Sequence, residues 1–442
     1  MESVDYLLCG EYVLPMDGTH RVIRDGAVAV QDGIIREVGA AGELLKRHPS
    51  ARVREGRGRA VLPGLVNTHT HAAMVLFRGL ADDLPLKEWL ENHIWPAEGR
   101  WLSPAFITDA VELACLEMLK AGITTYNDMY FFGDSTAAAT KKMGMRVVLG
   151  AGIVDFPTKT GKNADDYLRS AEKFIADWKG DAMISPCLSP HSAYACSPET
   201  LSKIRKAAER LEVPLSIHLS ETEWEVQEIL SRYGKRPVEH LDSLGLLSER
   251  LLAAHCVHLD DREITLLAER GVGVSHCVES NLKLASGIAP VPKMLAGGIR
   301  VAFGTDGAAS NNDLNIFSEM STAAKLHKAA AHDPTVLDAR TALLMATRWG
   351  AEVLGLGAVT GSIEEGKRAD LIAVDIRKPH LVPLYDIYSH LAYSAMASDV
   401  DTVLVDGVPV VEDMTFLRGD EDEILHKAAQ WGRKISLCNA RL

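Results

Sequence analysis

Histidines and carboxylates recur at the ends of short apolar segments through the middle of the chain. The runs VLPGLVNTH and IRVAFGTD each end with such a residue, and other runs follow the same pattern. A single buried histidine usually has only a structural role, but several at the ends of successive strands meet wherever the fold gathers those ends. The residues concerned are His69, His71, His191, His218, Glu221, His255, His276 and Asp306.

The spacing of these residues suits a metal ion. His69 and His71 are two residues apart, so in an extended segment both side chains face the same side and can reach one ion. His218 and Asp306 can add a nitrogen and an oxygen, a donor set that suits Zn²⁺ or another divalent transition ion. Such an ion with an open position lowers the pKa of a bound water from 15.7 to about 7. These residues therefore predict a hydrolytic metal centre.

The segments that carry these residues have the pattern of an α/β barrel. Eight apolar runs alternate with helix-compatible stretches such as SPAFITDAVELACLEMLKA. This alternation is typical of βα units, and eight units predict a TIM-like (β/α)8 barrel with its reactive groups at the carboxyl ends of the strands. We expect the catalytic barrel to occupy residues 61–364.

Both ends of the chain are rich in short strands. Asp32-Gly33 and Asp406-Gly407 each lie between two apolar runs, which predicts two-residue hairpin turns. We expect residues 1–60 and 365–442 to form one small β-sandwich domain, with two unrelated surface hairpins as the alternative.

Composition excludes several classes of partner. The 442 residues carry 47 Lys and Arg against 60 Asp and Glu, a net charge of −13, which disfavours a nucleic acid polymer. No run reaches the ~18 apolar residues of a membrane span, and no signal peptide is visible. The 7 cysteines are scattered and form no CxxC pair, which argues against disulfides. We expect a cytoplasmic protein with no membrane partner.

Several longer motifs resemble a known family. PGLVNTHTH, IHLSET, AHCVHL, SNLKLASGIAP and GTDGAASNN occur in this order, and GSIEEGKRADLIAVD follows near the carboxyl end. Together they resemble the amidohydrolase superfamily and, more closely, its 5'-methylthioadenosine/S-adenosylhomocysteine deaminase branch, with triazine hydrolases and chlorohydrolases as further relatives. The resemblance covers nearly the whole chain. It implies a metal-dependent deaminase that converts these or related 5'-modified adenosines to the inosine form and releases ammonia.

The resemblance also implies a ligand set for one divalent ion per subunit. The ligands would be His69, His71, His218 and Asp306. Superfamily members with two metals usually have a bridging lysine on the fourth strand, and the corresponding run here, AMISPCLSPH, has none. The expected ion is Zn²⁺, with Fe²⁺, Mn²⁺ or Ni²⁺ as alternatives.

Catalytic and substrate-binding roles follow from the same resemblance. Glu221 would carry a proton to the ring nitrogen beside the attacked carbon, His255 would orient or polarise the attacking water, and Asp306 would accept the proton of that water. Glu98, in IWPAE, matches a position that binds the ribose hydroxyls. His191, in LSPHSAY, matches another substrate contact. Glu221 and Asp306 would contact the substrate as well.

The chain departs from some relatives in one loop, and two other functions remain open. Some relatives carry arginines where Ala151 and Lys162 stand, which bears on the carboxylate end of S-adenosylhomocysteine. One alternative function is deamination of guanine or hydrolysis of a triazine, against which Glu98 argues. The other is an inactive scaffold, against which the complete ligand set argues. The expected partner is a small nucleoside, and related enzymes are often homo-oligomers.

Overall fold

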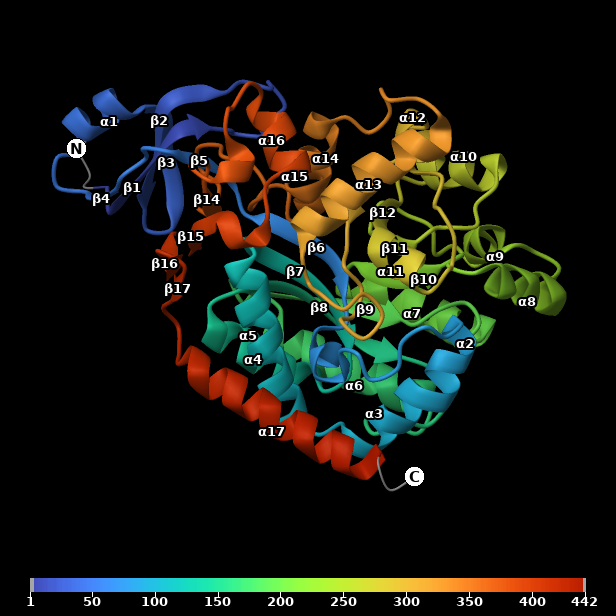
Figure 1. Cartoon of the computed structure of the whole chain (residues 1–442). Helices are drawn as coiled ribbons and strands as arrows, with labels where there is room; N and C mark the ends of the chain where they lie inside the picture. The colour runs from blue at the N-terminus through green and yellow to red at the C-terminus, as the bar shows by residue number, and fades with distance from the viewer. Residues whose placement is uncertain (1–3, 440–442) are drawn as a thin grey trace. The chain divides into compact units, whose positions relative to one another are not determined.

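The computed structural model describes residues 4–439, which form two compact units (Figure 1). One unit contains residues 4–67, 116–125 and 315–419, and the other contains residues 68–115, 126–314 and 420–439. The domain bounds expected from the sequence, 1–60 with 365–442 and 61–364, stay a prediction. None of the helices within residues 4–439 is both long and apolar enough to cross a membrane.

The first sheet is the eight-stranded barrel that the sequence predicts. Its strands, in spatial as well as chain order, are β6 (Leu65–Thr70), β7 (Ile123–Tyr130), β8 (Arg146–Ile153), β9 (Ile184–Pro190), β10 (Leu215–Leu219), β11 (Leu251–His255), β12 (Gly273–His276) and β13 (Val301–Phe303). The pairs from β8 to β13 are parallel. The first and last strands also lie side by side, because Thr68 Oγ1 donates to Phe303 O at 2.9 Å and Asp306 N donates to His69 O at 2.9 Å.

Helices follow the barrel strands along the chain. They are α4 (Pro104–Lys120), α5 (Gly133–Met143), α6 (Ala164–Trp178), α7 (Pro198–Leu211), α8 (Glu223–Tyr233), α9 (Pro237–Ser243), α10 (Asp261–Glu269), α11 (Val278–Lys283) and α12 (Val291–Ala296). The helix α17 (Glu421–Asn439) belongs to the same unit but comes after the strands of the other sheet. Polar residues define where several of them begin. The Ser197 side chain accepts a hydrogen bond from Thr200 N before α7, and Asp260 forms a capping box with Glu263 in α10.

A helical insertion separates β6 from α4. It contains η1 (Ala72–Phe77), α2 (Leu86–Trp89), the π-helical turn η2 (Leu90–Ile94) and α3 (Trp95–Trp101). The π turn lies between two α-helical segments without a break, an arrangement often found at functional sites. This insertion contributes Glu98 to the site described below.

A single mixed sheet forms the β-rich part of the other unit, and it draws strands from both ends of the chain (Figure 1). Its strand order is β17 (Thr415–Phe416), β16 (Val408–Glu412), β15 (Val400–Val405), β14 (Leu371–Asp375), β5 (Arg59–Pro63), β1 (Tyr6–Val13), β2 (Ile23–Gln31) and β3 (Ile34–Ala40), with β4 (Arg52–Arg54) paired to β1. The N-terminal and C-terminal strands meet where β14 runs antiparallel to β5. The expected β domain from both termini is therefore confirmed.

Both predicted hairpin turns are present in this sheet. Asp32 and Gly33 have φ values of 52° and 75°, and Asp406 and Gly407 have φ values of 53° and 76°. Two consecutive residues with positive φ are the signature of a type I′ turn, which matches the twist of the two strands it joins. The remaining helices of this unit are α1 (Ala41–Arg47), α13 (Ile316–Ala331), α14 (Ala339–Ala346), α15 (Arg348–Val353), η3 (Pro379–Leu381), α16 (Ile387–Tyr393) and η4 (Ala397–Asp399).

Candidate metal centre and substrate pocket

Four side chains meet at the carboxyl ends of the barrel strands. His69 lies in β6 and His71 directly follows this strand, His218 lies in β10, and Asp306 lies in the loop after β13. One ligand atom from each of the four lies within 4.8 Å of the others. The Nε2 atoms of His69 and His71 are 3.4 and 3.2 Å from Asp306 Oδ1. The structure thus brings together the four ligands expected from the sequence.

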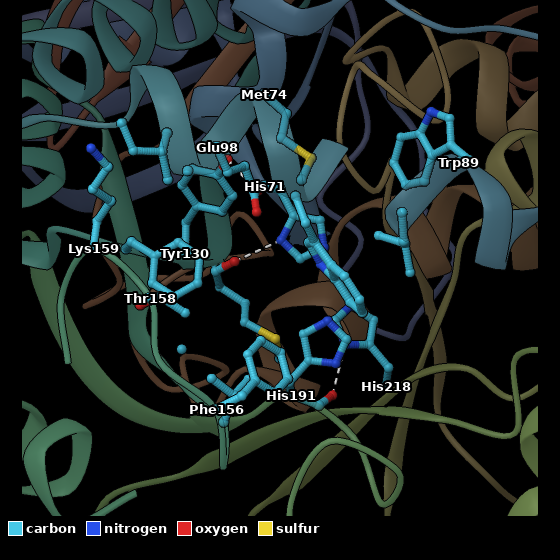
Figure 2. A pocket seen from close by; sticks show the side chains of 18 of the residues that line it. His71, Met74, Trp89, Glu98, Tyr130, Phe156, Thr158, Lys159, His191 and His218 are labelled. Carbon is cyan, nitrogen blue, oxygen red and sulfur yellow. Dashed lines mark hydrogen bonds between the residues drawn. The ribbon is translucent and has the colours of Figure 1, made fainter. Parts of the chain in front are cut away.

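The hydrogen bonds around the histidines make this cluster suitable for a cation. His71 Nδ1 donates to Met129 O at 2.6 Å, and His218 Nδ1 donates to His191 O at 2.7 Å (Figure 2). A carbonyl can only accept, so each neutral ring carries its proton on Nδ1 and turns the Nε2 lone pair inward. These two Nε2 atoms are 3.2 Å apart, and two facing lone pairs repel unless a positive charge lies between them.

Two further observations fit a bound ion. The fully buried His69 makes no well-formed hydrogen bond through either ring nitrogen within the described part of the chain, and its Nε2 has only the 3.4 Å contact with Asp306 Oδ1. Buried polar atoms without partners are costly and usually indicate a missing ligand or ion. Three imidazoles and one carboxylate are a donor set that holds divalent transition ions. The chemistry and placement of these residues therefore suit a divalent metal ion.

Asp306 presents only one of its oxygens to the histidines. Its Oδ2 accepts hydrogen bonds from Ser280 Oγ at 2.8 Å and from Ser310 Oγ at 2.7 Å, which leaves Oδ1 for the metal site. Burial alone would raise the pKa of Asp306, but the contacts with His69 and His71 hold it well below its usual value. Asp306 also has a φ of 60°, a strained conformation that recurs at functional sites.

A glutamate and a histidine lie next to these four side chains. His255 Nδ1 donates to Asn281 Oδ1 at 2.9 Å, which turns its Nε2 toward Glu221 Oε2 at 3.8 Å. Burial raises the pKa of Glu221, so that a larger fraction of this carboxyl group is protonated at a given pH. The backbone amides of Ser220 and Glu221 both donate to the buried Glu225 carboxylate, at 3.0 and 2.9 Å. Glu225 thereby fixes the turn that presents Glu221.

A cavity of about 280 Å³ opens onto this end of the barrel. Its walls include His71, His218, Glu221, His255 and Asp306 as well as Glu98, His191 and several aromatic rings. Figure 2 shows Tyr130 and Phe156 on the wall that also carries Lys159, with Trp89 apart from them. The His191 ring lies 4.5 Å from that of His218, centroid to centroid, and burial lowers the pKa of His191 to about 3, so it is neutral.

The predicted site residues occupy one region. The residues that line the cavity are His71, Glu98, His191, His218, Glu221, His255 and Asp306, whereas the buried His69 does not line it. Ala151 lies in β8 rather than in the loop expected from the sequence. Neither Ala151 nor Lys162 lines the cavity, whereas Lys159 of the β8–α6 loop does. The sequence reasoning missed Tyr130, Asn281 and the serine pair. Tyr130 ends β7, so its position at a strand end is a signal that could have identified it.

Comparison with known proteins agrees with this geometry. The amidohydrolase family model matches residues 60–410, and the chain belongs to this family. It is 53% identical over 432 residues to the 5-methylthioadenosine/S-adenosylhomocysteine deaminase of Thermodesulfovibrio yellowstonii, a match that covers 97% of this chain and 98% of the relative. It is 46% identical to the 5'-deoxyadenosine deaminase of Methanosarcina mazei, with 98% of each chain covered.

A solved structure agrees as well. The crystal structure of an adenosine deaminase from Xanthomonas campestris with bound zinc superposes with a TM-score of 0.97 at 42% identity, and the match covers 99% of both chains. The family expected from the sequence motifs is thus confirmed.

Proposed function

We propose that this protein is a metal-dependent hydrolase that removes the 6-amino group of 5'-modified adenosines. 5'-Methylthioadenosine and S-adenosylhomocysteine are the expected substrates, and the products are the inosine form and ammonia. The observation that carries the proposal is that the Glu221–His255 pair lines the same aromatic-lined cavity as residues of a four-member group able to hold a metal ion. The names of relatives with 43–53% identity support the same reaction.

The protein's residues divide the proton transfers of this reaction. A divalent ion, proposed here as Zn²⁺, would supply a water that ionises near neutral pH. Asp306, whose Oδ2 is held by the two serine hydroxyls, accepts a proton from the attacking water. Glu221, protonated, donates to the ring nitrogen beside the attacked carbon. Each such transfer typically contributes 10²–10⁴-fold to the rate.

His255 and Asn281 orient the nucleophile. Because Asn281 accepts the Nδ1 proton, His255 presents Nε2 to the centre of the site. This nitrogen can accept a hydrogen bond from the attacking water and direct its lone pair at the ring carbon. The oxygen of the water bonds to the carbon, and Asp306 passes the proton it received to the amino group, whose bond to the carbon breaks to release ammonia. The proton of the added hydroxyl returns to Glu221 as the new C=O bond forms.

The remaining walls suit a nucleoside. Glu98 offers a carboxylate to the ribose hydroxyls, and His191 offers a neutral ring to the base or sugar. Trp95 and Phe156, whose ring centroids are 5.6 Å apart, give an apolar surface that suits an uncharged 5' substituent. A guanine or triazine ring would leave the Glu98 carboxylate buried without a partner from the ligand, which is unfavourable.

An ultraviolet assay on metal-replete protein tests the proposal. The panel comprises 5'-methylthioadenosine, S-adenosylhomocysteine, 5'-deoxyadenosine, adenosine, guanine and an aminotriazine. We expect conversion to the hypoxanthine form with the 5'-modified adenosines. Turnover of guanine or the triazine alone would refute the assignment and favour another ring substrate. A protein that binds metal but converts no compound would favour a scaffold.

Three finer points complete the proposal. Elemental analysis of protein purified without chelators should find one Zn²⁺ per chain, and Fe²⁺, Mn²⁺ or Ni²⁺ are the alternatives. Related enzymes are often homo-oligomers, and sedimentation velocity would measure whether this chain forms one. The cytoplasm is the compartment expected from the scattered cysteines.

A further inference from the structure

Glu98 reaches the cavity from the helical insertion rather than from the barrel. It lies on α3, a helix of 7 residues, and its side chain is buried. Its Oε1 accepts a hydrogen bond from the Tyr130 hydroxyl at 2.6 Å. Among residues 4–439, no group donates a hydrogen bond to its other oxygen, Oε2. Glu98 is therefore held at one oxygen, and the second remains available to a ligand.

Tyr130 belongs to the rigid part of the site. It is the last residue of β7, a strand whose 8 residues are all buried, and its own side chain is 5% exposed. The preceding residue, Met129, supplies the carbonyl that fixes His71. One hydrogen bond thus links the position of Glu98 to the same strand end that orients a metal ligand. Figure 2 shows Glu98 and Tyr130 beside each other in the cavity wall.

A second contact of α3 with the cavity wall is apolar. Trp95, also on α3, packs against Phe156 of the β8–α6 loop with ring centroids 5.6 Å apart, but that contact is apolar and sets no direction for a carboxylate. The hydrogen bond from Tyr130 does, because a short bond to a charged acceptor is strong and directional. Burial and the neighbouring Glu98 charge raise the pKa of Tyr130 well above its usual value, so its hydroxyl keeps the proton that it donates.

We propose that Tyr130 is a positioning residue that sets selectivity for the ribose diol: its hydroxyl holds Glu98 Oε1, so that the carboxylate can receive the 2'- and 3'-hydroxyls together. This inference rests on the proposed function, because it assigns the sugar to Glu98. Without the tyrosine hydroxyl, Glu98 loses the one hydrogen-bond partner that it has among residues 4–439, and its carboxyl group rotates or becomes protonated. Burial already raises the pKa of Glu98 to about 7. The substrate then loses hydrogen bonds to both hydroxyls.

Kinetics with trimmed sugars test this role. The substrates are 5'-deoxyadenosine, 2',5'-dideoxyadenosine and 3',5'-dideoxyadenosine, and the proteins are the wild type, Tyr130→Phe and Tyr126→Phe. Tyr126 is a matched control, since it is a buried tyrosine of the same strand whose hydroxyl pairs with Thr140 Oγ1 at 2.5 Å and does not line the cavity. Both variants lose one buried hydroxyl, but only one of them loses the contact with Glu98.

The expected result is a change in selectivity rather than a uniform loss. In the wild type, kcat/KM should fall by about tenfold or more when either sugar hydroxyl is removed, since hydrogen bonds to charged groups are worth this much. In Tyr130→Phe, the kcat/KM values for the intact and the trimmed sugars should differ by no more than about threefold. This smaller difference should come largely from a higher KM for the substrate with the intact ribose. Tyr126→Phe should keep the wild-type ratio.

Three outcomes would overturn the inference, and they have different meanings. An equal loss on all three substrates in Tyr130→Phe would give Tyr130 a purely structural role and leave the deaminase assignment standing. Equal kcat/KM values of the wild type for all three substrates would show that Glu98 does not bind the ribose hydroxyls, and the deaminase assignment would again stand. Failure of the metal-replete wild type to convert any adenosine would refute the proposed function, and this inference with it.

Discussion

The two serines behind Asp306 should control how tightly the site holds its metal. Ser280 and Ser310 donate to the same oxygen, Oδ2, at 2.8 and 2.7 Å, and all three side chains are buried. A hydrogen bond to a buried charged group contributes about 1.5–3 kcal/mol. Residues that hydrogen-bond to metal ligands typically change the metal affinity by 10–100-fold when removed. We therefore expect Ser280→Ala or Ser310→Ala to weaken metal binding by about tenfold or more.

The double variant should lose more than the sum of the single losses. Either single variant leaves one hydroxyl on Oδ2, whereas the double variant leaves a buried carboxylate oxygen with none, at a further cost of about 1–3 kcal/mol. The two hydroxyls are also 3.2 Å apart, so each can partly replace the other.

Competition with a chelator of known affinity measures this effect without any assay of turnover. Ser275→Ala is the matched control, because Ser275 Oγ is buried and pairs with Thr68 Oγ1 at 2.7 Å rather than with Asp306. The visible spectrum of the Co²⁺-substituted protein gives a second readout of ligand geometry. If the double variant held metal as tightly as Ser275→Ala, the argument that the serines position Asp306 would be wrong.

Three more predictions follow from the site. Glu221→Gln should lower kcat by at least about 10²-fold with unchanged metal content, because the amide cannot donate and recover a proton; rapid turnover would contradict this role. Gly304→Ala should destabilise the barrel by about 1–3 kcal/mol in thermal unfolding, since its Cβ would stand 2.9 Å from His69 N. Gly42→Ala, with nothing within 4 Å, is its control and should not destabilise. Chelation should lower the Tm reversibly, because an ion at 1,000 times its Kd contributes about 4 kcal/mol; an unchanged Tm would argue against a tightly held ion.

The metal ligands could be predicted from the sequence because they depend on local patterns. Two histidines in alternate positions of an apolar strand face one side whatever the rest of the chain does. Once the eight βα units are recognised, the ends of β6, β10 and β13 must meet, so His218 and Asp306 join them. The hairpin turns at Asp32-Gly33 and Asp406-Gly407 were predictable for the same local reason.

The partners of the ligands could not be predicted in this way. Ser280 reaches Asp306 across 26 residues of sequence, and Tyr130 reaches Glu98 across 32. Serine and tyrosine occur throughout the chain. The sequence around them does not show whether a given hydroxyl binds a metal ligand or a substrate-binding residue, or instead faces solvent. Which hydroxyl meets which carboxylate depends on the path of the insertion and of the loops after β12 and β13, and these paths are set by tertiary packing.

His191 performs two tasks with two different chemical groups. Its backbone carbonyl fixes the protonation of His218, while its side chain lines the cavity. Met129 is arranged in the same way with respect to His71. Every amino acid has a backbone carbonyl. The side chains at positions 129 and 191 can therefore be varied in a combinatorial library while the two carbonyls still orient the imidazoles of His71 and His218. These two positions are thus natural starting points for evolving the enzyme toward new bases or sugars while its metal chemistry is inherited unchanged.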